Sequence, residues 1–104
     1  MRLERRVLGE AELAAALVEL PGWRIEGGKL HRELRFADFA AAWGFMSAAA
    51  LVSERLDHHP EWFNVYATVR VDLTTHDCGG ISPYDLEWAR RVERFVGGAA
   101  PSVG

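Results

Sequence analysis

The chain has 104 residues, of which 49% are hydrophobic and 26% charged, a combination typical of one folded domain rather than of a disordered chain. Its 12 basic and 15 acidic residues give a net charge of -3, and the basic residues are scattered, which argues against direct nucleic-acid binding. The longest apolar stretch, 45–52, is far shorter than the roughly 20 residues of a membrane span, and residues 1–6 carry no signal-peptide core. Together with the single cysteine, Cys78, these features predict a cytoplasmic protein that does not bind membranes.

The first third of the chain predicts a helix followed by a hairpin. Leucines at helical spacing indicate a helix over 10–20, which a Pro-Gly pair ends. The segments 23–26 and 30–36 flank Gly27 and Gly28, and a Gly-Gly pair accommodates the positive φ angles of a tight turn. We therefore expect two antiparallel strands after the first helix.

A second helix is predicted over 38–56, with Asp38 as its N-cap. Its apolar surface is unusually broad, because two neighbouring stripes follow helical spacing. The first stripe contains Phe39, Trp43, Met46 and Ala50, and the second contains Ala42, Phe45, Ala49, Val52 and Leu56. Covering one face of a sheet needs only part of this surface, so we expect a homodimer or homotetramer formed through the 38–56 helix. Burial of the whole helix within its own monomer is the alternative.

The segment 63–75 alternates apolar and polar residues and predicts strand, with Val65 placed on the same face as the other apolar residues. It forms either one long strand or two short ones broken near Ala67 and Thr68, neither of which is a strong turn former. A third helix is predicted from Ser82 onward, ending at a Gly-Gly pair that begins at residue 97, with Asp85 placed for a capping box.

The element order is helix, two strands, helix, strand or strands, and helix, and it implies an α+β fold in two layers. Three helices are expected to pack on one face of an antiparallel sheet. We predict a single domain over 1–104, with flexible ends at 1–8 and 97–104.

Three of the four histidines lie where predicted elements end. His58 and His59 come directly before Pro60, which disfavours helix for the preceding residue, and His76 begins a His-Asp-Cys-Gly-Gly run. Imidazole both donates and accepts protons near neutral pH, and the neighbouring Asp57, Glu61 or Asp77 can fix its tautomer. The pattern favours general acid-base catalysis. The simpler alternative is that the first two histidines bind helix-end carbonyls and the third is an ordinary strand-end residue.

A metal site is a second alternative for the same residues. Adjacent histidines diverge on most backbones, no His-x-x-x-His pair is present, and a His-x-Cys pair does not complete a tetrahedral ligand set. We therefore predict no metal at these histidines. Cys78 beside His76 is a weak signal for a nucleophile. Trp23 and Trp62 can line a flat pocket, although most tryptophans of small domains belong to the core.

Two segments together resemble the pterin-4a-carbinolamine dehydratase family. They are Asp-His-His-Pro-Glu-Trp-Phe-Asn-Val-Tyr at 57–66 and Leu-Thr-Thr-His-Asp-Cys-Gly-Gly-Ile-Ser at 73–82, followed by Asp85. The resemblance extends to Trp23 and the 39–46 part of the second helix. With 63–75 taken as two strands, we expect a four-stranded antiparallel sheet.

The resemblance implies an activity: dehydration of a 4a-hydroxytetrahydropterin to a quinonoid dihydropterin, which recycles a tetrahydrobiopterin-type cofactor left hydroxylated by an aromatic amino acid hydroxylase. It implies His58, His59 and His76 as catalytic residues, and no cofactor. Substrate contacts are implied for Pro60, Thr75, Asp77 and Cys78, and orienting or pocket roles for Glu54, Asp57, Trp23 and Asp85. The resemblance also implies an alternative function, a non-catalytic module that stabilises dimers of a partner protein through the second helix.

Overall fold

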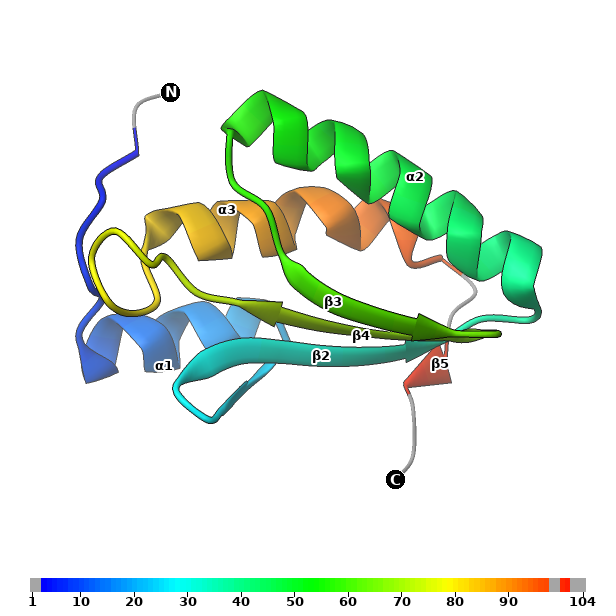
Figure 1. The fold of residues 1–104 in the computed structure, drawn as a ribbon. Helices are drawn as coiled ribbons and strands as arrows, with labels where there is room; N and C mark the ends of the chain where they lie inside the picture. Colours follow the sequence, from blue (N-terminus) through cyan, green and yellow to red (C-terminus); the bar gives the residue numbers. More distant parts are fainter. Residues whose placement is uncertain (1–2, 98–99, 102–104) are drawn as a thin grey trace.

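The computed structural model describes residues 3–97 and the backbone of residues 100–101. In chain order the elements are α1 (Glu10–Glu19), β1 (Arg24–Glu26), β2 (Lys29–Arg35), α2 (Phe39–Leu56), β3 (Glu61–Val65), β4 (Thr68–Leu73), α3 (Pro83–Val92), the 3-10 turn η1 (Glu93–Phe95) and β5 (Ala100–Pro101). All strand pairs are antiparallel, in the order β1-β2-β4-β3, and the two-residue β5 adds to β2. Figure 1 shows α2 and α3 over one face of the sheet, with α1 beside α3. The predicted α+β architecture is confirmed.

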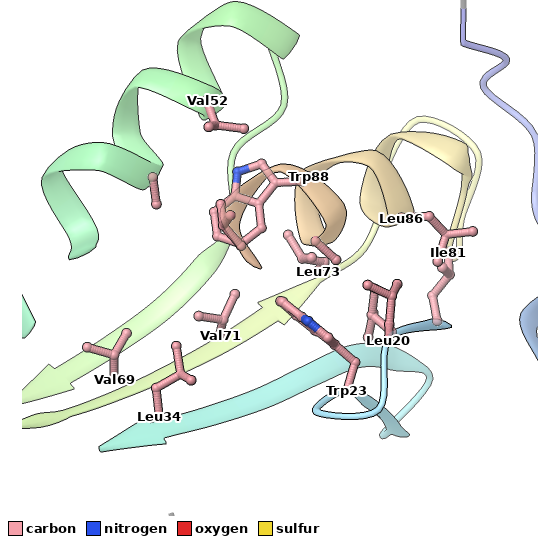
Figure 2. Packing of buried hydrophobic residues seen from close by; sticks show 14 of the residues in the cluster. Leu20, Trp23, Leu34, Val52, Val69, Val71, Leu73, Ile81, Leu86 and Trp88 are labelled. Carbon is pink, nitrogen blue, oxygen red and sulfur yellow. The ribbon is translucent and has the colours of Figure 1, made fainter. Parts of the chain in front are cut away.

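The core lies between this sheet face and the helices. Trp88 of α3 is its centre: it is fully buried, and it packs edge-on against Trp23 and Trp62 with ring centroids 6.3 Å apart in each pair. Its indole Nε1 donates to Ser53 Oγ of α2 at 2.9 Å. Figure 2 shows Trp88 between Val52 of α2 and the sheet residues beneath it. This core holds α2 and α3 against β4. The packing thereby also fixes the position of the loops at the ends of these three elements.

The segment 63–75 contains two strands, and the break falls at Tyr66 and Ala67. Tyr66 adopts a left-handed backbone with φ of 50°, and the Asn64 side chain donates to the carbonyl oxygens of Tyr66 and Thr68 at 3.1 and 2.9 Å. The turn changes which residues face inward. The prediction that Val65 faces the core is wrong, since Val65 is 56% exposed and Asn64 takes the inner side of β3 opposite Val69.

The described parts of both chain ends form hydrogen bonds or strand pairs with the rest of the fold. The N-terminal stretch contacts the rest of the fold at Leu8. This residue is buried, and its N–H donates to the Ile81 carbonyl at 2.9 Å. The third helix ends at Val92 rather than near residue 97, and η1 continues it. Of the predicted flexible C-terminal end, residues 98–99 and 102–104 lie outside the described residues, while the backbone of 100–101 pairs with β2. Within the described part of the chain, no helix has the length and apolarity to cross a bilayer.

Candidate active site

The loop after α2 carries the two adjacent histidines. Asp57 ends the helix in a left-handed conformation with φ of 49°, and its N–H donates to the carbonyls of Ser53 and Glu54. The His58 N–H then donates to the Ser53 carbonyl at 3.0 Å. This closure turns the chain three residues before Pro60, so that both imidazoles project from the junction between α2 and β3.

His58 is the buried member of the pair. Its side chain is 8% exposed, and its Nε2 lies 2.5 Å from Oδ1 of Asp85, which is fully buried. Such a short contact to a carboxylate is typical of a charge-assisted hydrogen bond. Since Asp85 engages Nε2, the other ring nitrogen, Nδ1, is the one that remains for proton exchange.

Asp85 holds more than the imidazole. Its Oδ2 accepts from the Thr75 hydroxyl and from the Ser82 N–H, each at 2.9 Å, and the Thr75 and Ser82 hydroxyl oxygens lie 2.6 Å apart. Asp85 is also the third residue of α3, so the same carboxylate completes the predicted capping box. One buried side chain therefore joins the start of α3, the end of β4 and His58.

His59 and His76 differ from His58 in being exposed, with side chains 55% and 78% accessible. His59 Nε2 lies 2.6 Å from Oε2 of Glu54, and His76 Nε2 lies 3.2 Å from Oε2 of Glu61. The other oxygen of Glu61 binds Lys29 Nζ at 2.5 Å. The pKa of Glu61 is lowered, chiefly by the hydrogen bond from Lys29 and further by His76, so Glu61 stays ionised beside the imidazole.

The three imidazoles thus share one arrangement. Each has a carboxylate against its Nε2, and within the described residues no hydrogen bond or ion pair joins one of these imidazoles to another. A carboxylate at Nε2 fixes the proton there and leaves Nδ1 as the acceptor. Imidazoles held in this way can take up and release protons on a bound molecule.

The loop that carries His76 is a tight turn. Thr75 bridges to Gly80, and Gly79 has a φ of 79°. Cys78 Sγ lies 3.6 Å from the Thr75 carbonyl oxygen and is partly buried, which leaves the thiol turned toward its own loop. Contacts among its own residues therefore stabilise the loop, and His76 lies on its solvent-exposed side.

The comparisons with known proteins cover both histidine segments. A model of the family described as "Pterin 4 alpha carbinolamine dehydratase" matches residues 6–95. This chain belongs to the pterin-4a-carbinolamine dehydratase family. The matched range includes both histidine loops and every helix and strand except β5, and it confirms the family that the two sequence segments indicated.

Curated relatives match this chain along nearly their full length. A protein of Solibacter usitatus is 50% identical over 91 residues, covering 88% of this chain and 96% of the relative, and one of Novosphingobium aromaticivorans is 54% identical over 91 residues, covering 86% and 95%. Both carry the provisional name pterin-4-alpha-carbinolamine dehydratase.

Two solved structures share the fold. A Brucella melitensis protein described as a transcriptional coactivator/pterin dehydratase superposes with a TM-score of 0.84 at 44% identity, covering 88% of this chain and 99% of that one. A pterin dehydratase-like protein described as a RuBisCO assembly factor in the alpha-carboxysome has a TM-score of 0.62 at 25% identity, covering 74% and 92%.

Two of the residues predicted for the candidate site have other roles in the fold. Trp23 is a core residue, 5% exposed, and its indole N–H donates to Glu93 at 2.9 Å, so the prediction that it lines a pocket is wrong. Asp57 caps α2, and within the described contacts its carboxylate orients no histidine. Thr75 belongs to the site region, but it is only 2% exposed and its hydroxyl donates to Asp85. Its side chain therefore helps to position Asp85.

Two further residues, not predicted from the sequence, lie near the candidate site. The Tyr84 ring lies 5.7 Å from the His58 ring, and the Arg5 guanidinium sits 4.4 Å over Tyr84 while its Nη1 reaches Asp77 at 3.4 Å. Arg5 lies in the stretch predicted to be flexible, 72 residues away from Asp77 in the chain. No local pattern marks such a long-range contact, so sequence periodicity offered no signal for it.

Proposed function

We propose that this protein removes water from a 4a-hydroxytetrahydropterin by general acid-base catalysis with His58, His59 and His76. The observation that carries the proposal is the carboxylate at each Nε2, on residues that match the family's two characteristic segments. Pro60, Asp77 and Cys78 are proposed to contact the pterin. Glu54 is proposed to orient His59, and Asp85 to orient His58.

The proposed reaction needs two proton movements. A base removes the proton from N5 of the pterin, and the nitrogen electron pair forms the C4a=N5 double bond as the C4a–O bond breaks. An acid protonates the departing hydroxyl, which leaves as water. The products are a quinonoid dihydropterin and water, so no electrons are exchanged and no cofactor is required. In the cell the substrate would come from an aromatic amino acid hydroxylase, and we expect both proteins to act in the cytosol.

The test is the loss of 4a-hydroxytetrahydropterin, generated by a hydroxylase and followed by absorbance with and without the protein. We expect the protein to accelerate this loss, and a strong chelator to leave the acceleration unchanged. Protein that is folded by circular dichroism yet does not accelerate the loss would contradict the proposal. An acceleration abolished by chelator would instead contradict its metal-free mechanism.

A second role, as an interaction module, is favoured by the outer side of α2. The inner stripe of this helix is buried, but Phe39, Trp43 and Leu51 are 49%, 55% and 70% exposed. Exposed apolar side chains gathered on one helix are typical of an interface. We therefore propose that α2 forms a homodimer or homotetramer, or binds a partner protein in the manner of a dimer-stabilising module.

Sedimentation at micromolar concentration tests the oligomer. We expect a species larger than a monomer, and Trp43→Glu should shift it toward the monomer, because a carboxylate is costly to bury in an apolar interface. Val18→Glu is the matched control, since Val18 is 81% exposed on α1 and lies outside the proposed interface. A monomeric wild type, or equal effects of the two substitutions, would contradict the proposal.

A further inference from the structure

A groove lies between α2 and the end of α3 on the helical side of the molecule. The two helices pack side by side over the sheet (Figure 1). The groove has a volume of about 860 Å³ and is open to solvent. Its α2 side is formed by residues spaced i, i+3, i+4 and i+7, which share one side of the helix: Ala48, Leu51, Val52 and Arg55. A groove between two packed helices is a common receptor for a third, amphipathic helix.

The fold gathers at this groove basic residues that are scattered in the sequence. Arg55 on the α2 side faces three arginines from α3 and η1, namely Arg90, Arg91 and Arg94. Four of the 12 basic residues therefore line one groove of a chain whose net charge is -3. Glu54 also lines the groove, but its carboxylate is engaged with the His59 imidazole at 2.6 Å. The groove thus carries a surplus of positive charge.

Most of this charge is not neutralised within the described part of the chain. Arg55 and Arg94 are exposed and take part in none of the ion pairs found there. Arg90 and Arg91 share one carboxylate, that of Glu87, at 3.8 and 2.8 Å. A single carboxylate balances the charge of one guanidinium, so the groove can accept further carboxylates from a partner.

Apolar side chains lie among these charges. Leu51 is mostly exposed, and Phe95 is partly buried with the Arg94 guanidinium 5.0 Å from its ring centroid. Apolar groups bordered by arginines are typical of protein-protein interfaces. A phosphate backbone would pair with the arginines and leave Leu51 uncovered, whereas an amphipathic helix satisfies both kinds of group. The composition of the groove therefore favours a protein ligand over a nucleic acid.

We propose that this groove binds an acidic amphipathic helix of a partner protein. The helix would place apolar side chains on Leu51 and Phe95, and its carboxylates against the arginines on both sides. Arginine and carboxylate form paired, planar hydrogen bonds, which fix the register of the helix as well as adding affinity. The proposal rests on the interaction role proposed above for α2, with which it shares Leu51, and it specifies the chemistry of the partner. Phe39 and Trp43 lie outside the groove lining, so the two surfaces can be tested separately.

Fluorescence anisotropy with a designed peptide tests the proposal. The probe is a labelled helical peptide of about 18 residues, with leucines at i, i+3, i+4 and i+7 and glutamates on the flanking positions. The control peptide has glutamine in place of each glutamate. We expect saturable binding of the glutamate peptide, weakened at least about 10-fold in the glutamine peptide and weakened as the ionic strength rises from about 0.1 to about 1 M. No binding of the glutamate peptide, or equal binding of the two peptides, would overturn the proposal.

Charge reversal in the protein locates the bound peptide. Arg55→Glu and Arg94→Glu should each weaken binding at least about 10-fold, because each replaces attraction to a carboxylate by repulsion. Arg35→Glu is the matched control, since Arg35 is also exposed and strand alternation places it on the sheet face opposite the helices. Circular dichroism should show all three variants folded, as each changes an exposed side chain. Equal weakening by the control and by the groove variants would contradict the assignment to this groove.

Two further measurements test other occupants of the groove. A single-stranded oligonucleotide of the same charge as the peptide should bind at least about 10-fold more weakly, because it cannot cover the apolar residues. Sedimentation of Arg94→Glu should match that of the wild type, whereas a shift toward the monomer would assign the groove to a second copy of this chain. Tighter binding of the oligonucleotide, or such a shift, would overturn the proposal.

Two controls separate this proposal from those on which it depends. Trp43→Glu should keep the peptide affinity of the wild type even where it changes the oligomeric state, because Trp43 lies outside the groove lining. The dehydration rate of Arg94→Glu should equal that of the wild type, since Arg94 contacts none of the three site histidines among the described ion pairs. Loss of peptide binding is therefore distinguishable from a failure of the proposed oligomer or of the proposed dehydration.

Discussion

Replacing His59 or His76 by alanine should lower the kcat for dehydration by about 10²- to 10⁴-fold, the range that one acid-base group supplies. Both side chains are more than half exposed, so their removal takes away little packing. The free energy of unfolding should therefore stay within about 0.5 kcal/mol of the wild type. Steady-state kinetics and urea unfolding of the same preparations measure the two quantities. A large loss of turnover without a loss of stability is the pattern of groups that act on substrate.

Variants of Glu54, the partner of His59, and of the neighbouring Arg55 test whether the loss of activity is specific to the histidine. Glu54→Gln removes the charge beside His59 and should cause a smaller loss of kcat than His59→Ala, because the imidazole itself remains. Arg55→Ala is the matched control, since Arg55 is exposed on the same turn of α2 and takes part in none of the ion pairs found among the described residues, the His59–Glu54 pair included. Added imidazole should restore part of the activity of His59→Ala. If both histidine variants turn over at the wild-type rate, the proposed mechanism is wrong.

The fold was predictable wherever one signal dominated locally. Asp38 accepts from the Ala41 N–H at 2.8 Å and starts α2 as expected, and Ser82 and Asp85 form the predicted capping box. These interactions join residues three apart, so their geometry follows from spacing alone. The turn at Tyr66 could not be predicted in this way, because a tyrosine with positive φ is held there by Asn64 and the β3-β4 pairing rather than by its own preference.

Residue type and spacing indicated the histidines of the candidate site, whereas the orienting roles of Glu54 and Asp85 were expected only from the family resemblance. Periodicity and Pro60 place His58 at a helix end, but nothing near it in sequence indicates a buried carboxylate 27 residues later as its partner. Residue type left Trp23 open between pocket and core, and the resemblance favoured the pocket, whereas Trp23 is buried in the core and its indole N–H donates to Glu93. Residue type and spacing therefore indicated which chemistry was available, and only the packing of α3 against β4 shows which groups hold the imidazoles in place.

Asp85→Asn should lower the free energy of unfolding by about 2–4 kcal/mol and also reduce kcat. Asp85 is fully buried and accepts from three sides: the His58 imidazole, the Thr75 hydroxyl and the Ser82 N–H. An amide has one acceptor oxygen in place of two, and its NH₂ group would face groups that donate, so at least one buried donor loses its partner. Loss of the charge also breaks a buried ion pair with His58 whenever the imidazole is protonated. Urea unfolding and steady-state kinetics measure the two losses.

Ser82→Ala separates the two tasks of this carboxylate. It removes the hydroxyl that caps α3 and contacts Thr75, which should cost about 1 kcal/mol, but it leaves Asp85 in place against His58. The short contact between His58 and Asp85 should give a downfield imidazole N–H resonance in wild type and in Ser82→Ala, and this resonance should vanish in Asp85→Asn. If Asp85→Asn keeps that resonance and its turnover, and differs from the wild type only in stability, then Asp85 acts as a helix cap alone. In that case His58 must owe its position to the chain closure at Asp57 and to the Tyr84 ring.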